Sequence, residues 1–178
     1  METLEKYDHV EISKVEGEAT PIYNIVEPKY TAKELEVLKD WKKIVSQSEI
    51  QLIHGEPDIS LRWQTLKDRV LSALPDAPNK DIVARKIVGM AFGYGDIGLL
   101  IDDDNLEEVM VNGITLPVFV FHRKHGMCKT KIVFKATADI NQMIHNLCFI
   151  NNKEIKPIVD IATMDGNRLN ITGCTRTR

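Results

Sequence analysis

The sequence predicts an α+β protein. An extended start and a three-helix subdomain over residues 1–94 precede an antiparallel sheet with a flanking helix over residues 95–178. In the first part, apolar residues recur at steps of three and four, as they do on one face of an amphipathic helix. In the second part, short apolar runs are separated by turn residues, as in antiparallel strands. We therefore expect a boundary between two subdomains near residue 95.

The helical subdomain is expected to begin after an extended segment. The apolar run 22–26 ends at Glu27-Pro28, and the proline disfavours helical geometry in the residue before it. Thr31 and Glu34 have the spacing of a capping box and predict the start of the first helix. The face of this helix that we expect to form core carries Leu35, Leu38, Trp41, Val45 and Leu52.

Two further helices complete this subdomain. The second is indicated by Leu66, Val70 and Leu74, which precede Pro75. The third is indicated by Val83, Ile87, Met90 and Tyr94, which precede Gly95. Three helices joined by short connections can bury one another's apolar faces, so these residues are predicted to form a common core.

The second subdomain is predicted from three apolar runs and one helix. The runs are 109–111, 118–121 and 131–134, and turn residues separate them. Residues 139–150 return to helical spacing, and Asp139 suits the positive N-terminus of that helix. We expect the helix to pack on the antiparallel sheet.

The last predicted strands form a hairpin around Asp165-Gly166. A two-residue loop would place Ile161 opposite Asn170, whereas a three-residue loop over residues 165–167 places Ile161 opposite Ile171. A slip of one residue moves partners between the core and solvent faces, so the match of apolar residues favours the three-residue loop. Gly166 or Asn167 would take the left-handed turn conformation.

Composition and charge exclude several classes of protein. A net charge of −3 with scattered basic residues leaves no basic surface for a polyanion, which disfavours nucleic-acid binding. Three cysteines, an odd number without close pairing, suit a reducing cytosol better than a disulfide scaffold. No apolar run approaches the ~18 residues of a membrane span, and the acidic N-terminus does not resemble a secretory signal. The sequence therefore predicts a cytosolic protein.

The run Gly93–Gly98 matches the dinucleotide fingerprint Gly-x-Gly-x-x-Gly, but its context does not. The fingerprint requires a strand before it and a full helix after it, so that the pyrophosphate lies on the helix N-terminus. Here a helical pattern precedes the glycines, and the carboxylates of Asp102–Asp104 would repel phosphate. We interpret the glycines as a loop that joins the two subdomains.

Two patterns are compatible with metal binding. Asp102–Asp104 could hold a hard cation, but we expect Asp103 or Asp104 to cap the next helical turn, since Asp104 and Glu107 have capping-box spacing. The spacing of His122, His125 and Cys128 could suit a transition metal, with Cys148 or Cys174 as a fourth ligand. The three residues straddle a turn at 124–126, however, so the spacing is weak support and no metal site is predicted.

The stretch Gly95–Gly113, together with Pro157–Asp160 and Asp165–Arg168, resembles one family. The chain resembles type II and type IV secretion ATPases, including those that build archaeal pili and the archaellum. In that family a short helix, an acidic turn and a strand such as Glu108–Gly113 open the domain before the motor. The resemblance covers roughly residues 20–178 and implies a sensor-like antiparallel sheet with a flanking helix.

The motor domain of that family is absent from this sequence. A phosphate-binding loop requires Gly-x4-Gly-Lys-Ser/Thr, and no glycine here is followed by lysine. We therefore expect no ATP hydrolysis by this chain, and interpret it as the N-terminal portion of a longer hexameric protein. The resemblance implies that the motor domain would hold ATP and Mg²⁺. It also implies partners: neighbouring subunits, a membrane platform protein at the inner face of the cell membrane, and cytosolic assembly factors.

The resemblance also implies which residues meet the nucleotide. Family members bring arginines from this domain onto nucleotide held by the motor, and the Asp-Gly-x-Arg pattern matches at Asp165–Arg168. Arg168 is expected to face outward with Asn170 and Asp160 on the hairpin, and its planar guanidinium suits phosphate. Arg176 is a second candidate, and Arg178 lies in the same segment.

No catalytic residue is predicted, because none of the serines lies in a strained Gly-x-Ser-x-Gly turn. The alternative to an assembly domain is a free-standing ligand-sensing or adaptor module with the same sheet but no motor. This alternative predicts an apolar ligand cavity.

Overall fold

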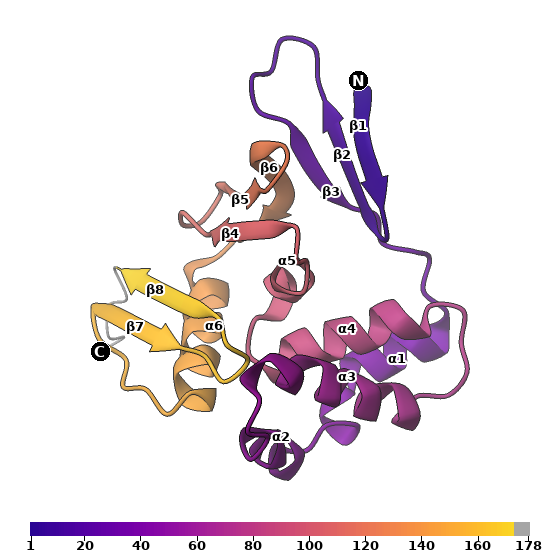
Figure 1. Ribbon diagram of the computed structural model, residues 1–178, viewed down its shortest axis with the longest axis vertical. Coiled ribbons are helices and arrows are strands. Elements are labelled where there is room, and N and C mark those ends of the chain that lie inside the picture. The colour runs from indigo at the N-terminus through magenta and orange to yellow at the C-terminus, as the bar shows by residue number, and fades with distance from the viewer. Residues whose placement is uncertain (173–178) are drawn as a thin grey trace. The chain divides into compact units, whose positions relative to one another are not determined.

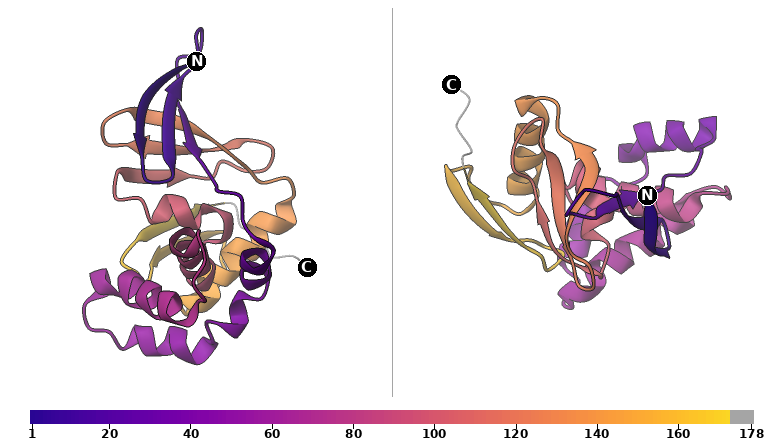
Figure 2. Two further views of the ribbon diagram at one scale, coloured as in Figure 1. Left: turned by 90° about the vertical axis from the view of Figure 1, so that its right-hand side faces the viewer. Right: turned by 90° about the horizontal axis from the view of Figure 1, so that it is seen from above.

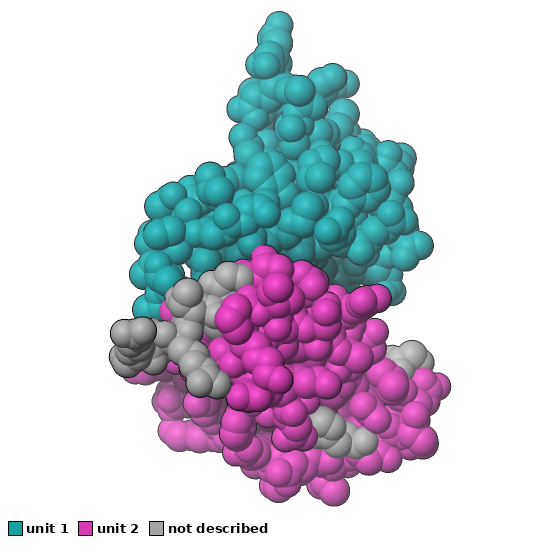
Figure 3. All heavy atoms as spheres, turned by 90° about the vertical axis from the view of Figure 1, so that its left-hand side faces the viewer, with its two compact units in different colours: residues 1–29, 99–140 teal, residues 30–98, 141–178 magenta. Residues whose placement is uncertain are grey.

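The structure is a computed structural model that describes residues 1–172 and contains both helices and strands, as predicted. The chain forms two compact units, shown in different colours in Figure 3. The first unit consists of residues 1–29 and 99–140, and the second consists of residues 30–98 and 141–172. This division differs from the expected one near residue 95, because the N-terminal strands join the sheet formed by residues 106–133.

The first unit contains a six-stranded sheet in the order β1-β2-β3-β6-β5-β4 (Figure 1). Its strands are β1 (Glu2–Tyr7), β2 (Val10–Lys14), β3 (Ile22–Ile25), β4 (Leu106–Met110), β5 (Pro117–His122) and β6 (Gly126–Val133). The three runs predicted as strands are confirmed as strands, although β4 ends before Val111 and β6 ends before Phe134.

The predicted antiparallel pairing is confirmed among β4, β5 and β6, but the six-stranded sheet as a whole is mixed. β3 pairs with β6 in parallel, at Ile22↔Lys129 and Tyr23↔Thr130, whereas the other pairs are antiparallel. The sequence did not reveal this pairing, since it joins segments about a hundred residues apart. The indigo strands β1–β3 and the orange strands of the same sheet can be followed in the two views of Figure 2.

The second unit contains most of the helices. They are α1 (Ala32–Lys39), α2 (Gln47–His54), α3 (Arg62–Ala73) and α4 (Lys80–Ala91), with short 3₁₀ turns η1 (Trp41–Lys43), η2 (Ile59–Leu61) and η3 (Gly95–Ile97). Two helices cross the limits of the units: α5 (Gly98–Ile101) begins in the second unit, and α6 (Thr137–Ile150) ends in it.

The first predicted helix is broken into α1, η1 and α2. The capping box of Thr31 and Glu34 is present, as predicted. A second capping box of Ser46 and Glu49 starts a new helix, because the Ser46 side chain accepts from the Glu49 N–H and the Glu49 carboxylate accepts from the Ser46 N–H. The predicted core face is therefore wrong at its ends: Leu35 is 54% exposed and Leu52 is 64% exposed.

The other two predicted helices are confirmed as α3 and α4. Leu66 and Val70 of α3 and Val83 and Ile87 of α4 are buried. Trp63 of α3 stacks on Phe92, with ring centroids 5.3 Å apart.

The glycines of the run Gly93–Gly98 allow close backbone contacts. A Cβ atom on Gly98 would lie 2.8 Å from the Cα of Gly89, in α4. Gly93 has φ +91°, and a Cβ there would lie 3.2 Å from the backbone nitrogen of Leu147, in α6. Helix α4 precedes this run and no strand does, so the phosphate geometry of the fingerprint is absent.

The C-terminal hairpin pairs β7 (Ile158–Ala162) with β8 (Arg168–Thr172). Ile161 lies opposite Leu169, so the predicted pairing with Ile171 is wrong. The loop has three residues, as expected, but they are 164–166, because the Thr163 N–H donates to the Asn167 carbonyl. The difference in register is two residues, which preserves the predicted faces. Gly166, with φ +93°, takes the left-handed position.

Among residues 1–172, no helix is both long and apolar enough to cross a membrane.

Candidate functional site

The predicted nucleotide contact Arg168 lies on the exposed face of the β7–β8 hairpin. It is opposite Ala162 and shares that face with Asn170 and Asp160, as predicted. The Asn170 side chain donates to Asp160 Oδ1 at 2.8 Å. Within the described residues, Arg168 forms no hydrogen bond or ion pair, so its guanidinium is available to a phosphate. The other candidates, Arg176 and Arg178, lie outside the described residues.

The loop of this hairpin is held by side chains of the same unit. The Tyr94 hydroxyl donates to Asp165 Oδ1 at 2.8 Å, and burial and the negative charge of Asp165 raise the pKa of Tyr94. The Met164 N–H donates to Asn151 Oδ1 at 2.7 Å, and Arg62 Nη1 donates to the Met164 carbonyl at 2.8 Å. Arg168 therefore projects from a hairpin whose turn is fixed at three points.

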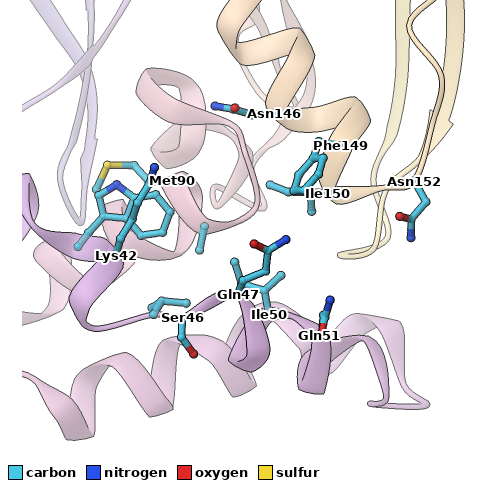
Figure 4. Close-up of a pocket in the computed structure, with 13 residues that line it drawn as sticks. Lys42, Ser46, Gln47, Ile50, Gln51, Met90, Asn146, Phe149, Ile150 and Asn152 are labelled. Atoms are coloured by element: carbon cyan, nitrogen blue, oxygen red, sulfur yellow. The ribbon is translucent and has the colours of Figure 1, made fainter.

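The second unit also contains a cavity of about 730 Å³. Figure 4 shows its lining residues, which come from η1, α2, α4 and α6 and from the segments next to them. The apolar lining consists of Trp41, Val45, Ile50, Met90, Ala91, Phe149 and Ile150. The polar lining consists of Lys42, Ser46, Gln47, Gln51, Asn146 and Asn152.

The chemistry of this cavity favours an amphipathic ligand. Its volume lies within the range of about 300–1,000 Å³ that is usual for small-molecule sites. The described lining includes four side-chain amides, which can both donate and accept hydrogen bonds, and no carboxylate. Lys42 is its only charged residue, so a neutral or anionic molecule with an apolar body fits best.

The first unit contains a polar network centred on Asp103, which is only 9% exposed. Asp103 Oδ2 accepts from the hydroxyls of Tyr7 at 2.6 Å and Tyr23 at 2.5 Å, while Oδ1 accepts from the Asn105 N–H at 2.9 Å. Burial by itself would raise the pKa of Asp103, but the hydrogen bonds from Tyr23 and Tyr7 outweigh it and hold this pKa below its usual value. Asp103 is therefore a buried carboxylate that orients two tyrosines.

His122 extends this network toward the β5–β6 turn. Its Nδ1 accepts from the N–H groups of Lys124 at 3.2 Å and His125 at 3.3 Å, and its Nε2 lies 3.3 Å from the Tyr7 hydroxyl oxygen. Because Nδ1 is an acceptor, the ring proton is on Nε2, which donates to Tyr7. Burial, followed by the charge of His125, lowers the pKa of His122 and favours the neutral ring.

Glu5 of β1 lies against this turn. Its Oε2 is 2.6 Å from His125 Nε2 and its Oε1 is 3.0 Å from Lys124 Nζ. Hydrogen bonds from His125 and then from Lys124 lower the pKa of Glu5. Glu5 meets the turn although β2, β3 and β6 lie between β1 and β5 in the sheet, so the sheet must curve.

The structure corrects two interpretations of these residues. No helix begins after Asp104, so the predicted helix cap is wrong; Asp103 instead closes a turn onto Asn105 before β4. The side chains near His122 and His125 include Glu5 in place of the suggested Cys128, which is buried and points its thiol toward the Gly126 carbonyl. Sequence reasoning missed Glu5, since nothing local links it to a turn more than a hundred residues away.

Comparison with protein-family models found no match to this chain. Two proteins of Methanocaldococcus jannaschii are similar to parts of it. The uncharacterized protein MJ1288 is 30% identical over 175 residues, which cover 93% of this chain and 66% of that protein. The uncharacterized protein MJ0781 is 45% identical over 84 residues, which cover 44% of this chain and 12% of that protein. The chain therefore spans slightly less than two thirds of the first relative and a small part of the second, much longer one.

Proposed function

We propose that this chain is the N-terminal regulatory and assembly portion of a hexameric secretion-type ATPase. Such a motor powers assembly of the archaellum or a type IV pilus, or type II secretion. The proposed protein works in the cytoplasm, at the inner face of the cell membrane, where it contacts a platform protein and cytosolic assembly factors. The sheet of the first unit would be the sensor-like domain of that family.

The local structure of the motif-bearing segments supports this proposal. The stretch Gly95–Gly113 contains the short helix α5, an acidic turn and the strand β4, the order that the family resemblance implies. The similar segment in MJ0781 is a small part of a much longer protein, as expected of a module that accompanies other domains.

The observation that carries the proposal is the placement of Arg168. The residue is exposed and has no partner within the described residues, and it projects from a hairpin whose loop is tied down at Met164 and Asp165. An unpaired guanidinium on an anchored hairpin suits bidentate contact with a phosphate, since its planar fork is free and the backbone that carries it is already positioned. Arg168, with Arg176, would contact ATP and its Mg²⁺-bound phosphates held by the motor domain.

The test is ATP turnover by the full-length natural protein carrying Arg168→Ala. A charge-assisted bidentate contact contributes about 1.5–3 kcal/mol, so turnover should fall roughly ten- to hundredfold if the contact forms in the transition state. Arg168→Lys should rescue poorly, because an ammonium cannot reproduce the planar fork.

Arg123→Ala is the matched control, because Arg123 is also exposed and has no side-chain partner within the described residues. Its turnover should equal that of the wild type. Full turnover by Arg168→Ala would refute the nucleotide role. A large fall in melting temperature without a separate kinetic defect would show instead that Arg168 stabilises the hairpin.

A second candidate is a free-standing ligand-sensing module, and the cavity of the second unit favours it. The matching segment forms 66% of MJ1288 but only 12% of MJ0781, and this candidate is supported by MJ1288, in which the module makes up most of the protein. The cavity has the expected apolar walls, although amides also line it.

The dye 1-anilinonaphthalene-8-sulfonate, a flat apolar molecule with one negative charge, is a suitable probe of this cavity. Saturable dye fluorescence that is weakened by Trp41→Ala and Lys42→Gln would support a ligand site. Dye fluorescence of both variants that equals that of the wild type would exclude the cavity as the binding site. A gene that continues into a phosphate-binding loop would favour the ATPase proposal over the sensing module.

A further inference from the structure

The first unit brings three potential metal ligands together at the β5–β6 turn. Glu5, His122 and His125 each offer one ligand atom, and these atoms all lie within 4.8 Å of one another. His122 is buried, while the side chains of Glu5 and His125 are 28% and 14% exposed. The cluster is therefore fixed on its inner side and open to solvent on its outer side.

We propose that Glu5, His122 and His125 form a binding site for one divalent transition-metal ion. Two imidazoles and a carboxylate suit Zn²⁺, Co²⁺ or Ni²⁺, with water in the remaining coordination positions. Mg²⁺ and Ca²⁺ prefer sites built from oxygen ligands, so they should bind poorly here.

The hydrogen bonds of His122 already select the tautomer that a metal needs. Nδ1 carries the lone pair and accepts two long backbone N–H contacts, of 3.2 Å and 3.3 Å. Coordination through Nδ1 would leave the ring proton in place, but the Lys124 and His125 N–H groups would have to turn away from this nitrogen. Nε2–H would still donate to Tyr7, whose hydroxyl donates to Asp103. Ligating histidines usually donate their other ring N–H to a carboxylate, a carbonyl or water, and here Tyr7 relays this hydrogen bond to Asp103.

The backbone is irregular next to two of the proposed ligands. A β-bulge in β1 lies between Thr3 and Glu5, and another in β4 lies between Leu106 and Glu108, opposite His122. Bulges re-aim neighbouring side chains and are frequent beside functional sites. His125 lies in the tight loop that follows His122. The ring centroids of His122 and His125 are 5.0 Å apart. The β1 bulge therefore adjoins Glu5, and the β4 bulge begins at the residue opposite His122.

A metal ion would have to displace the contacts that Glu5 makes when no metal is bound. These are the contact with His125 Nε2 at 2.6 Å and the ion pair with Lys124 Nζ at 3.0 Å. Lys124 is 66% exposed, so its ammonium can move into solvent at little cost.

The test is calorimetric titration of Zn²⁺ into tag-free, chelator-treated protein, followed by the visible spectrum of the Co²⁺ form. We expect one equivalent of Zn²⁺, and a Co²⁺ spectrum without a thiolate charge-transfer band, because no cysteine belongs to the site. His125→Ala and Glu5→Gln should each weaken Zn²⁺ binding at least roughly tenfold, and Tyr7→Phe should weaken it by a smaller factor through loss of orientation.

His9→Ala and His145→Ala are the matched controls, because each removes a histidine outside the cluster and should leave the affinity unchanged. Zn²⁺ should raise the melting temperature of the wild type and leave that of Glu5→Gln nearly unchanged, which separates lost binding from lost folding. Equal affinity of wild type, His125→Ala and Glu5→Gln, a thiolate band with Co²⁺, or no binding of Zn²⁺ would each overturn the proposal.

Discussion

Of the three carboxylates in the run Asp102–Asp104, only that of Asp103 is buried. It accepts hydrogen bonds from Tyr7 of β1 and Tyr23 of β3, so it joins the N-terminal strands to the turn before β4. A buried carboxylate that accepts several hydrogen bonds is costly to alter, because its partners lose their acceptor and remain buried.

Asp103→Asn should therefore destabilise the first unit by about 3 kcal/mol, because the amide keeps one weaker acceptor and turns an N–H₂ group toward hydroxyl partners. Chemical denaturation measures this change. Asp104→Asn is the matched control, since Asp104 is exposed, and should change stability by less than about 0.5 kcal/mol. Equal effects of the two substitutions would show that the tyrosine contacts do not stabilise the fold.

Glu34 has the same role in the second unit. It is 4% exposed, and it accepts from the Thr31 N–H at 2.7 Å and the Asn79 N–H at 2.9 Å. The hydrogen bond from Thr31 is the main reason that the pKa of Glu34 falls to about 2, and the bonds from Asn79 also lower it. Glu34 thus both caps α1 and holds the residue that precedes α4.

The lowered pKa predicts how stability depends on pH. A carboxyl whose pKa is lower in the folded state stabilises the protein above its unfolded pKa, here 4.5, and loses this effect as the pH falls toward about 2. Glu34→Gln should therefore be less stable than the wild type near neutral pH, and the difference should shrink on acidification. Denaturation at several pH values measures it, with exposed Glu36→Gln as the control. A difference that does not change with pH would contradict this assignment.

At the scale of elements, helix α4 is held by a backbone contact that only glycine permits. Gly89 of α4 and Gly98 at the start of α5 approach so closely that a Cβ on either would lie 2.8 Å from the other's Cα. Backbone atoms cannot move aside as a flexible side chain can, so this contact sets how closely the two segments pack.

Gly89→Ala should destabilise the second unit by about 1–3 kcal/mol, measured by thermal or chemical denaturation. The sign of the change makes the test sharp, because glycine to alanine in an ordinary helix interior stabilises by about 1 kcal/mol. A more stable Gly89→Ala variant would show that Gly89 and Gly98 do not pack in this way.

Local signals identified some elements and not others. The capping box of Thr31 and Glu34 and the apolar faces of α3 and α4 were predictable, because each depends on residues within a few turns of one another. The helix break before Ser46 was not predicted, although Ser46 and Glu49 have the spacing of a capping box. The faces of the C-terminal hairpin were predicted correctly but its register was not, because loops of the same length can begin at different residues.

At the scale of the whole molecule, the chain leaves its first sheet after β3, forms the helices α1–α4, and returns to complete the same sheet with β4–β6. A sheet assembled in this way depends on contacts between distant segments, so it should form late relative to the local helices. The N-terminal strands β1 and β2 are also rich in charged residues, so they contain no apolar run that would predict a strand.

The isolated chain should not hydrolyse ATP above a protein-free control, as measured by phosphate release. Positioning and charge neutralisation by a phosphate-binding loop, its lysine and Mg²⁺ provide nearly all of the rate in this chemistry, and the sequence has no such loop. Phosphate release that scales with protein concentration and persists in Arg168→Ala would contradict the proposed division of roles.

The sequence alone determined the mixed helical and strand composition, the strands β4–β6, the helices α3 and α4, and the exposed face of Arg168. These features follow from periodicity and turn residues, which act over short stretches of chain. The tertiary structure alone decided that β3 pairs in parallel with β6, that Asp103 orients Tyr7 and Tyr23, and that Glu5 meets His122 and His125. Each of these contacts joins residues about a hundred positions apart, and only the folded sheet brings them together.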